Sequence, residues 1–158
     1  MLDQQENMPG FLGSDAVAVA VGAVFGALSR YQAGEVAANW IAKDPARKSL
    51  QGWHTAAINI AGSFVLGSLA GTPTAVKLPP SAPVAMTPGI QGLSPRTQLL
   101  MSVGFCGSFT TFSTFSVDVA RWMAEGKFDK AIRYIFANNV GGVVAAAAGM
   151  LITRKIFS

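Results

Sequence analysis

Three stretches of this chain, of 18, 21 and 20 residues, contain no charged side chain: residues 55–72, 97–117 and 134–153. About 20 apolar residues are enough to cross the hydrocarbon core of a bilayer. A fourth apolar stretch, 16–42, carries Arg30 and Glu35, so it is either a span with functional charges or a shorter span that ends near Arg30. Four such stretches in 158 residues predict an all-α integral membrane protein with four transmembrane helices, not a soluble domain.

We predict one four-helix membrane domain over residues 16–155. Residues 1–15 carry three acidic side chains and no Lys or Arg, so they are expected to form a solvated leader and not a secretory signal, which needs a basic start. Residues 73–95 hold six of the eight prolines, which predicts a loop without regular structure. The fourth helix is expected to begin near Asp129, an acidic N-cap candidate.

Spaced small residues predict close packing of these helices, notably Gly22-x-x-x-Gly26 and Gly67-x-x-x-Gly71. Four short, tightly packed helices cannot easily enclose a polar path, so a path is expected between subunits. The loops on the side of the termini hold four basic residues, Lys77, Arg96, Arg154 and Lys155. The other side holds seven, Lys43, Arg47, Lys48, Arg121, Lys127, Lys130 and Arg133. Under the positive-inside rule, this excess of basic residues on the side opposite the termini favours termini outside the cell. Because the excess is small, insertion in both orientations is permitted.

The third span is a poor hydrocarbon segment. Residues 104–116, GFCGSFTTFSTFS, place two glycines and six hydroxyl residues among four phenylalanines. Glycine and threonine weaken a helix, and backbone that is not helical inside a membrane must line a cavity or be buried in protein. We therefore predict that the third helix, from about Arg96 to Met123, is broken, with freed carbonyls turned toward an ion.

Polar and aromatic side chains accompany this motif. Asn59-Ile-Ala-Gly-Ser63 places an amide and a hydroxyl at mid-membrane. They either make contacts between helices or form an anion ligand, since the amide is a neutral donor that binds an anion weakly enough to release it. Phe112 and Phe115, three residues apart, share a helix face. They either pack in the core or present the positive edges of their rings to an anion.

Three segments together resemble the CrcB/Fluc fluoride channels: residues 22–31 (GAVFGALSRY), 57–67 (AINIAGSFVLG) and 104–116. The resemblance covers roughly residues 16–72 and 96–155 and keeps the family's order. It implies four-helix subunits in an antiparallel, dual-topology homodimer in the cell membrane, which exports cytoplasmic fluoride passively through two pores. Fluoride and the lipid bilayer would be its partners.

The resemblance also implies roles for single residues. The fluoride pathway would include Asn59, Phe112, Phe115, Thr55, Thr111, Ser113, Thr114, Tyr134 and Asn138. Arg30 would lie at a vestibule, and the backbone carbonyls of Gly107 and Thr110 would hold a structural sodium ion (Na+), with the chain bending at Gly107. The chain departs from the family at Asn138 and Gly142 on the fourth helix, and at Asp118, where a glutamate is common.

Other functions have less support. One cysteine and one histidine exclude an intramolecular disulfide and a thiolate or histidine cluster, and no nucleophile–base pair predicts an enzyme. A net charge of +4, spread over loops, fits lipid headgroups better than nucleic acid. The main rival is a small proton-coupled transporter, for which Glu35 would be the membrane carboxylate. A membrane protein with no transport role would leave the hydroxyl-rich motif unexplained.

Overall fold

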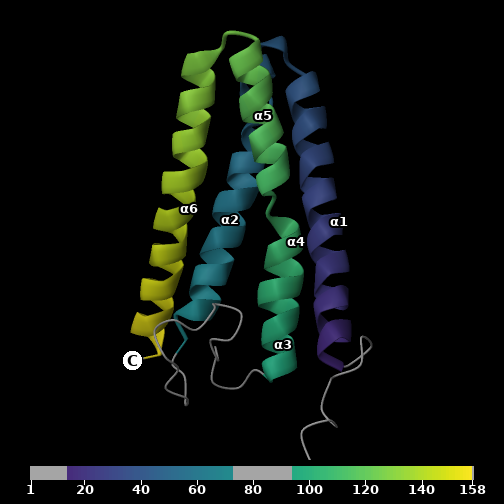
Figure 1. Ribbon diagram of the computed structural model, residues 1–158, viewed down its shortest axis with the longest axis vertical. Coiled ribbons are helices and arrows are strands. Elements are labelled where there is room, and N and C mark those ends of the chain that lie inside the picture. The colour runs from purple at the N-terminus through teal and green to yellow at the C-terminus, as the bar shows by residue number, and fades with distance from the viewer. Residues whose placement is uncertain (1–13, 73–93, 158) are drawn as a thin grey trace, which may run out of the picture.

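The computed structural model of this protein describes residues 14–72 and 94–157, and every regular element in these residues is a helix. The all-α prediction is therefore confirmed for the described part of the chain. The predicted leader at 1–15 and the predicted loop at 73–95 fall almost wholly outside these ranges. The long helical columns lie side by side along the longest axis of the molecule (Figure 1).

The elements follow in chain order and are: α1 (Ser14–Ala42), the 3₁₀ helix η1 (Pro45–Leu50), α2 (Trp53–Ala70), α3 (Pro95–Leu99), the π-helical η3 (Leu100–Cys106), α4 (Gly107–Phe109), α5 (Phe112–Ala124) and α6 (Phe128–Ile156). α3, η3, α4 and α5 follow one another in a single column, which is interrupted once, between α4 and α5 (Figure 1). The predicted third span thus runs from Pro95 to Ala124 and is broken.

Three of these columns are long and apolar enough to cross a membrane: Ser14–Ala42, Pro95–Ala124 and Phe128–Ile156. The fourth, α2, has 18 residues and is shorter. The structure therefore confirms a helical protein with several membrane-spanning segments. α2 packs chiefly against α6, whereas α1 packs against η3 and α4, so the broken column is held on one side by α1.

Glycines lie where helix backbones approach most closely. A Cβ atom at Gly67 of α2 would lie 2.1 Å from the Ala146 carbonyl oxygen of α6, and one at Gly22 of α1 would lie 2.1 Å from the Leu100 carbonyl oxygen of η3. Both distances are far inside van der Waals contact, so no larger residue fits without moving a backbone. In a membrane, where apolar side chains gain little by leaving lipid, such close contact is a main source of helix association.

The start of α6 differs from the prediction. Asp129 is not the N-cap: Lys127 occupies that position without a side-chain cap, and Asp129 lies in the first turn, paired with Arg133. The reason is the preceding turn, in which Gly126 adopts φ +72° and the Lys127 N–H donates to the Trp122 carbonyl of α5 at 2.8 Å. This glycine turn ends α5 and starts α6 by backbone bonds alone.

We predict that Gly67→Ala destabilises the protein, because its methyl group would force α2 away from α6 at the cost of about 1–3 kcal/mol. Gly34→Ala is the matched control. Gly34 lies within α1, and no atom of the described part of the chain lies within 4 Å of a new Cβ, so better helix propensity should leave stability unchanged or raise it by up to about 1 kcal/mol. The unfolding midpoints of both variants in detergent test this. Equal midpoints would show that the close approach of α2 and α6 does not hold the fold together.

Candidate functional site

The interruption of the third span lies at Thr110 and Thr111. α4 ends at Phe109, Thr110 has φ −80° and ψ 157°, and Thr111 has φ −148° and ψ 115°, so both residues are extended. The Thr111 hydroxyl accepts a hydrogen bond from the Thr114 N–H at 3.3 Å and caps the start of α5. Two successive threonines suit this place because a β-branched residue tolerates extended backbone and a hydroxyl caps a helix.

The bend is not at Gly107, which was the predicted position. Gly107 has φ −62° and ψ −32° and is helical, and the extended residues come three positions later. The position of the break is set by a contact with another helix and not by the flexibility of glycine.

That contact is made by Asn59 of α2. Its side-chain oxygen accepts the Thr111 N–H at 2.8 Å, and its Nδ2 donates to the Thr111 carbonyl at 3.2 Å. The same Nδ2 donates to Asn138 Oδ1 of α6 at 2.9 Å. An amide nitrogen carries two protons, so both of its donors are in use. Asn59 thus replaces the helical hydrogen bonds that Thr111 has lost and ties the break to α6.

Arg30 approaches the break from α1. Its Nη1 donates to the Thr110 carbonyl oxygen at 3.3 Å. Arg30 and Thr110 are 80 residues apart in sequence, and the fold brings the positive charge of Arg30 beside the interrupted backbone. The vestibule role suggested for Arg30 stays a prediction.

The two phenylalanines of the motif have different surroundings. Their rings are in contact, with centroids 5.5 Å apart, but Phe112 is 77% exposed and Phe115 is 9% exposed. Phe115 packs on Tyr134 of α6 at 5.5 Å, and Tyr134 is fully buried between Trp53 and Trp122. Of the two rings, Phe112 alone is open to a second molecule or an ion from outside the protomer.

Most of the predicted pathway residues come together around this break. Asn59, Thr111 and Asn138 are joined by hydrogen bonds, and the Ser113 and Thr114 hydroxyls lie 3.2 and 3.1 Å from that of Thr111. Thr55 of α2 and Tyr134 of α6 are both buried, and the Tyr134 carbonyl accepts a hydrogen bond from the Asn138 amide at 3.1 Å. Tyr134 donates to Asp118 at 3.3 Å. Asp118 had no predicted site role, because the uncharged run ends at the residue before it.

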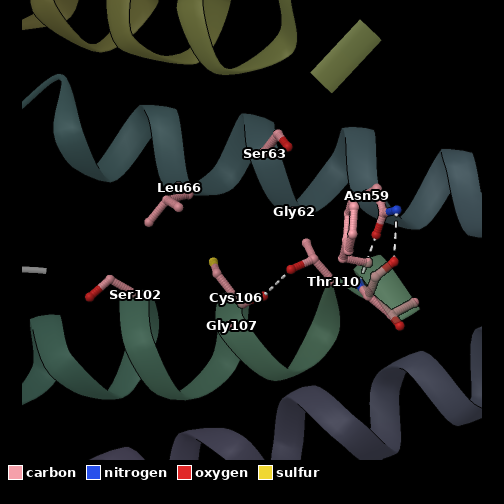
Figure 2. Close-up of a pocket in the computed structure, with 10 residues that line it drawn as sticks. Asn59, Gly62, Ser63, Leu66, Ser102, Cys106, Gly107 and Thr110 are labelled. Carbon is pink, nitrogen blue, oxygen red and sulfur yellow. Dashed lines mark hydrogen bonds between the residues drawn. The ribbon is translucent and has the colours of Figure 1, made fainter. Parts of the chain in front are cut away.

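A cavity of about 280 Å³ lies between α2 and the broken column. Figure 2 shows Asn59, Ser63 and Leu66 on the α2 side and Ser102, Cys106 and Thr110 on the other. Gly62, Gly107, Thr111 and Phe112 complete the lining. Neither Ser63 nor Ser102 is among the pathway residues that the resemblance implies. The signal for Ser63 was its position four residues after Asn59, which puts both side chains on one face of a helix.

The backbone carbonyls of Gly107 and Thr110, which the resemblance assigns to a sodium ion, lie at the break. The Thr111 N–H donates to Asn59 instead of to the Gly107 carbonyl four residues earlier, which frees that oxygen from the usual helical bond. The Thr110 carbonyl accepts from Arg30 and keeps a second lone pair. Backbone carbonyls are oxygen ligands that can replace the water of an alkali cation. The oxygens at the break therefore fit a monovalent cation by donor type.

The family match and the similar proteins of known name all point to one family. The family model described as CrcB-like protein, Camphor Resistance (CrcB), matches residues 17–150. A protein of Gloeobacter violaceus named fluoride-specific ion channel FluC is 30% identical over 142 residues, which is 90% of this chain and 98% of the relative. Fluoride-specific ion channel FluC 2 of a Synechococcus species is 35% identical over 97% of this chain and 89% of the relative. FluC of Rhodospirillum centenum is 33% identical over 84% and 91%.

We predict that Asn59→Leu strongly destabilises the protein. The substitution removes three hydrogen bonds and leaves the Thr111 N–H, the Thr111 carbonyl and the Asn138 oxygen without their partner. Each buried group left unpaired costs about 1–3 kcal/mol, so the loss should reach at least about 3 kcal/mol.

Asn139→Leu is the matched control for this prediction. Asn139 is exposed, and within residues 14–72 and 94–157 its amide bonds only to the Ile135 carbonyl of its own helix, so its loss should change little. The unfolding free energies of both variants in detergent provide the test. If the two variants lose the same stability, Asn59 does not hold the break.

Proposed function

This chain belongs to the CrcB family, and we infer from that membership that it is a fluoride-specific ion channel of the cell membrane. The observation that carries this inference is a family match over most of the chain. In addition, relatives named fluoride-specific ion channel FluC align with this chain along nearly their whole length. These relatives are ion channels, which agrees with the prediction that this chain is no enzyme. Its membrane-spanning helices fit the same conclusion.

The chemistry around the break supports an anion path. Fluoride is a hydrogen-bond acceptor, so a path must offer donors in place of water, and the cavity beside the break is lined by an amide and four hydroxyls. The exposed ring of Phe112 lies at the same place and can direct its positive edge toward an anion. We propose that Asn59, Phe112, Phe115, Thr55, Thr111, Ser113, Thr114, Tyr134 and Asn138 form the pathway, with Arg30 at its vestibule.

We also propose that two copies pair in antiparallel orientation and that α2 crosses the membrane as a fourth span. Phe112 is 77% exposed, so an ion beside its ring is enclosed only if a second chain covers it. The weak charge asymmetry between the two sides permits both orientations. α2 carries no charged side chain outside its first turn and has 18 residues, which is enough to cross a thin or locally adapted bilayer.

A structural sodium ion is part of the same proposal. Gly107 and Thr110 from each subunit would hold it through their carbonyl oxygens, since the break frees these oxygens from helical bonding. When bound, the ion would supply positive charge near the path and so favour an anion there.

The direct test of this function is fluoride efflux from liposomes that contain only this purified protein. We predict that fluoride leaves when a potassium ionophore balances the charge and the pH is equal on both sides, whereas chloride is retained. Liposomes without protein are the control. Chloride efflux as fast as that of fluoride would contradict the proposal.

The same assay separates a channel from a proton-coupled transporter. Glu35, the carboxylate that such a transporter would use, is exposed on α1, so Glu35→Gln should leave fluoride efflux intact. Efflux that needs a pH gradient, or that Glu35→Gln abolishes in a folded protein, would favour the transporter.

We predict that Phe112→Ile lowers fluoride efflux without lowering stability. Isoleucine keeps an apolar side chain but removes the positive ring edge, and Phe112 is too exposed in the protomer to support its core. Phe136→Ile, at a residue of α6 that is 66% exposed, is the matched control and should leave efflux unchanged. Unchanged efflux in Phe112→Ile would mean that the ring takes no part in the path.

A further inference from the structure

The hydrogen-bond donors of the cavity decide where an anion can bind, because an anion only accepts hydrogen bonds. Asn59 is the one amide side chain of the lining, and both of its N–H bonds are donated, to the Thr111 carbonyl and to Asn138. In this conformation Asn59 links α2 to Thr111 and to α6 through hydrogen bonds, and it has no N–H left for a bound anion. The donor must come from another lining residue or from a rearrangement that breaks one of these bonds.

Three of the four hydroxyls that line the cavity are also committed. Ser102 donates to the Gln98 carbonyl at 2.7 Å, and Thr110 donates to the Cys106 carbonyl at 3.0 Å. Thr111 donates to the Thr114 hydroxyl at 3.1 Å. Each of these protons points to a protein oxygen, so none is available to an ion without a loss elsewhere.

Ser63 is the exception. Its hydroxyl has no hydrogen-bond partner among residues 14–72 and 94–157, although it lines the same cavity. It lies one helical turn beyond Asn59 on α2 (Figure 2). The Ser63 hydroxyl also lies near Gly142 of α6: a Cβ atom added to Gly142 would lie 3.4 Å from the Ser63 hydroxyl oxygen. Because Gly142 has no side chain, the α6 backbone, and not a side chain, borders this hydroxyl at that position.

We propose that Ser63 is a fluoride-binding residue whose hydroxyl donates to the ion in the cavity, one turn along the path from Asn59. This proposal rests on the proposed function, and it assigns the hydrogen bond to the ion on α2 to Ser63, because both N–H bonds of Asn59 are donated to protein. The two residues then have different roles. Asn59 stabilises the break through hydrogen bonds to protein groups, and the Ser63 hydroxyl donates a hydrogen bond to the ion.

The test compares fluoride efflux of the full-length protein in liposomes with that of Ser63→Ala. Loss of one hydrogen bond to an ion should lower efflux at limiting fluoride about tenfold. Thermal stability should not change, because the hydroxyl bonds to no described protein group. The control is Ser68→Ala, also on α2, which lies outside the cavity and donates to the Phe64 carbonyl; its efflux should match that of the unaltered protein.

A second pair of variants keeps the test decisive if Ser63→Ala folds poorly. Ser63→Thr and Ser63→Val have nearly the same shape and differ in the hydroxyl, so the threonine variant should pass fluoride and the valine variant should not. Equal efflux in this pair would overturn the assignment of Ser63. The proposed function fails separately, if the unaltered protein itself releases no fluoride.

Discussion

The pairing of the Asn59 side chain with the backbone of Thr111 is the interaction on which the site depends. A backbone that leaves the helical conformation inside a bilayer exposes an N–H and a C=O that lipid cannot satisfy. Asn59 has one acceptor and two donors, and it uses them on the Thr111 N–H, the Thr111 carbonyl and Asn138. The break is therefore stable where it lies, and α2, α5 and α6 are fixed relative to one another at that level.

The features beside the break follow from this pairing. Because the Thr111 N–H is turned to Asn59, the Gly107 carbonyl is released, and the Thr110 carbonyl is turned toward Arg30. α5 restarts at Phe112 with a capped end, which projects the Phe112 ring outward and brings the Phe115 ring against Tyr134. The cavity lies between the helix that provides Asn59 and the column that is broken. The same small set of bonds thus brings together polar side chains, an exposed ring edge and carbonyls released from helical bonding.

Much of the fold was predictable, because uncharged stretches of about 20 residues leave few alternatives and the Gly/Thr/Phe motif is incompatible with an uninterrupted span. The position of the break was not, because it depends on Asn59, 52 residues away, whereas Gly107 remains helical. Spacing predicted that Phe112 and Phe115 share a helix face, and their rings are in contact, but their different exposure depends on α6, which spacing does not describe. The start of α6 was misplaced, since a glycine turn determines it instead of the Asp129 side chain.

The exchange rate of the Thr111 amide proton, measured by NMR on protein labelled at threonine in lipid nanodiscs, tests the central claim most directly. The Thr110 amide is an internal reference, because it donates to the Cys106 carbonyl of the preceding helical segment and not to Asn59. If Asn59 holds the break, the Thr111 amide exchanges slowly in the unaltered protein and much faster in Asn59→Ala, while the Thr110 amide stays slow in both. A Thr111 amide that exchanges equally in the two proteins would contradict the account.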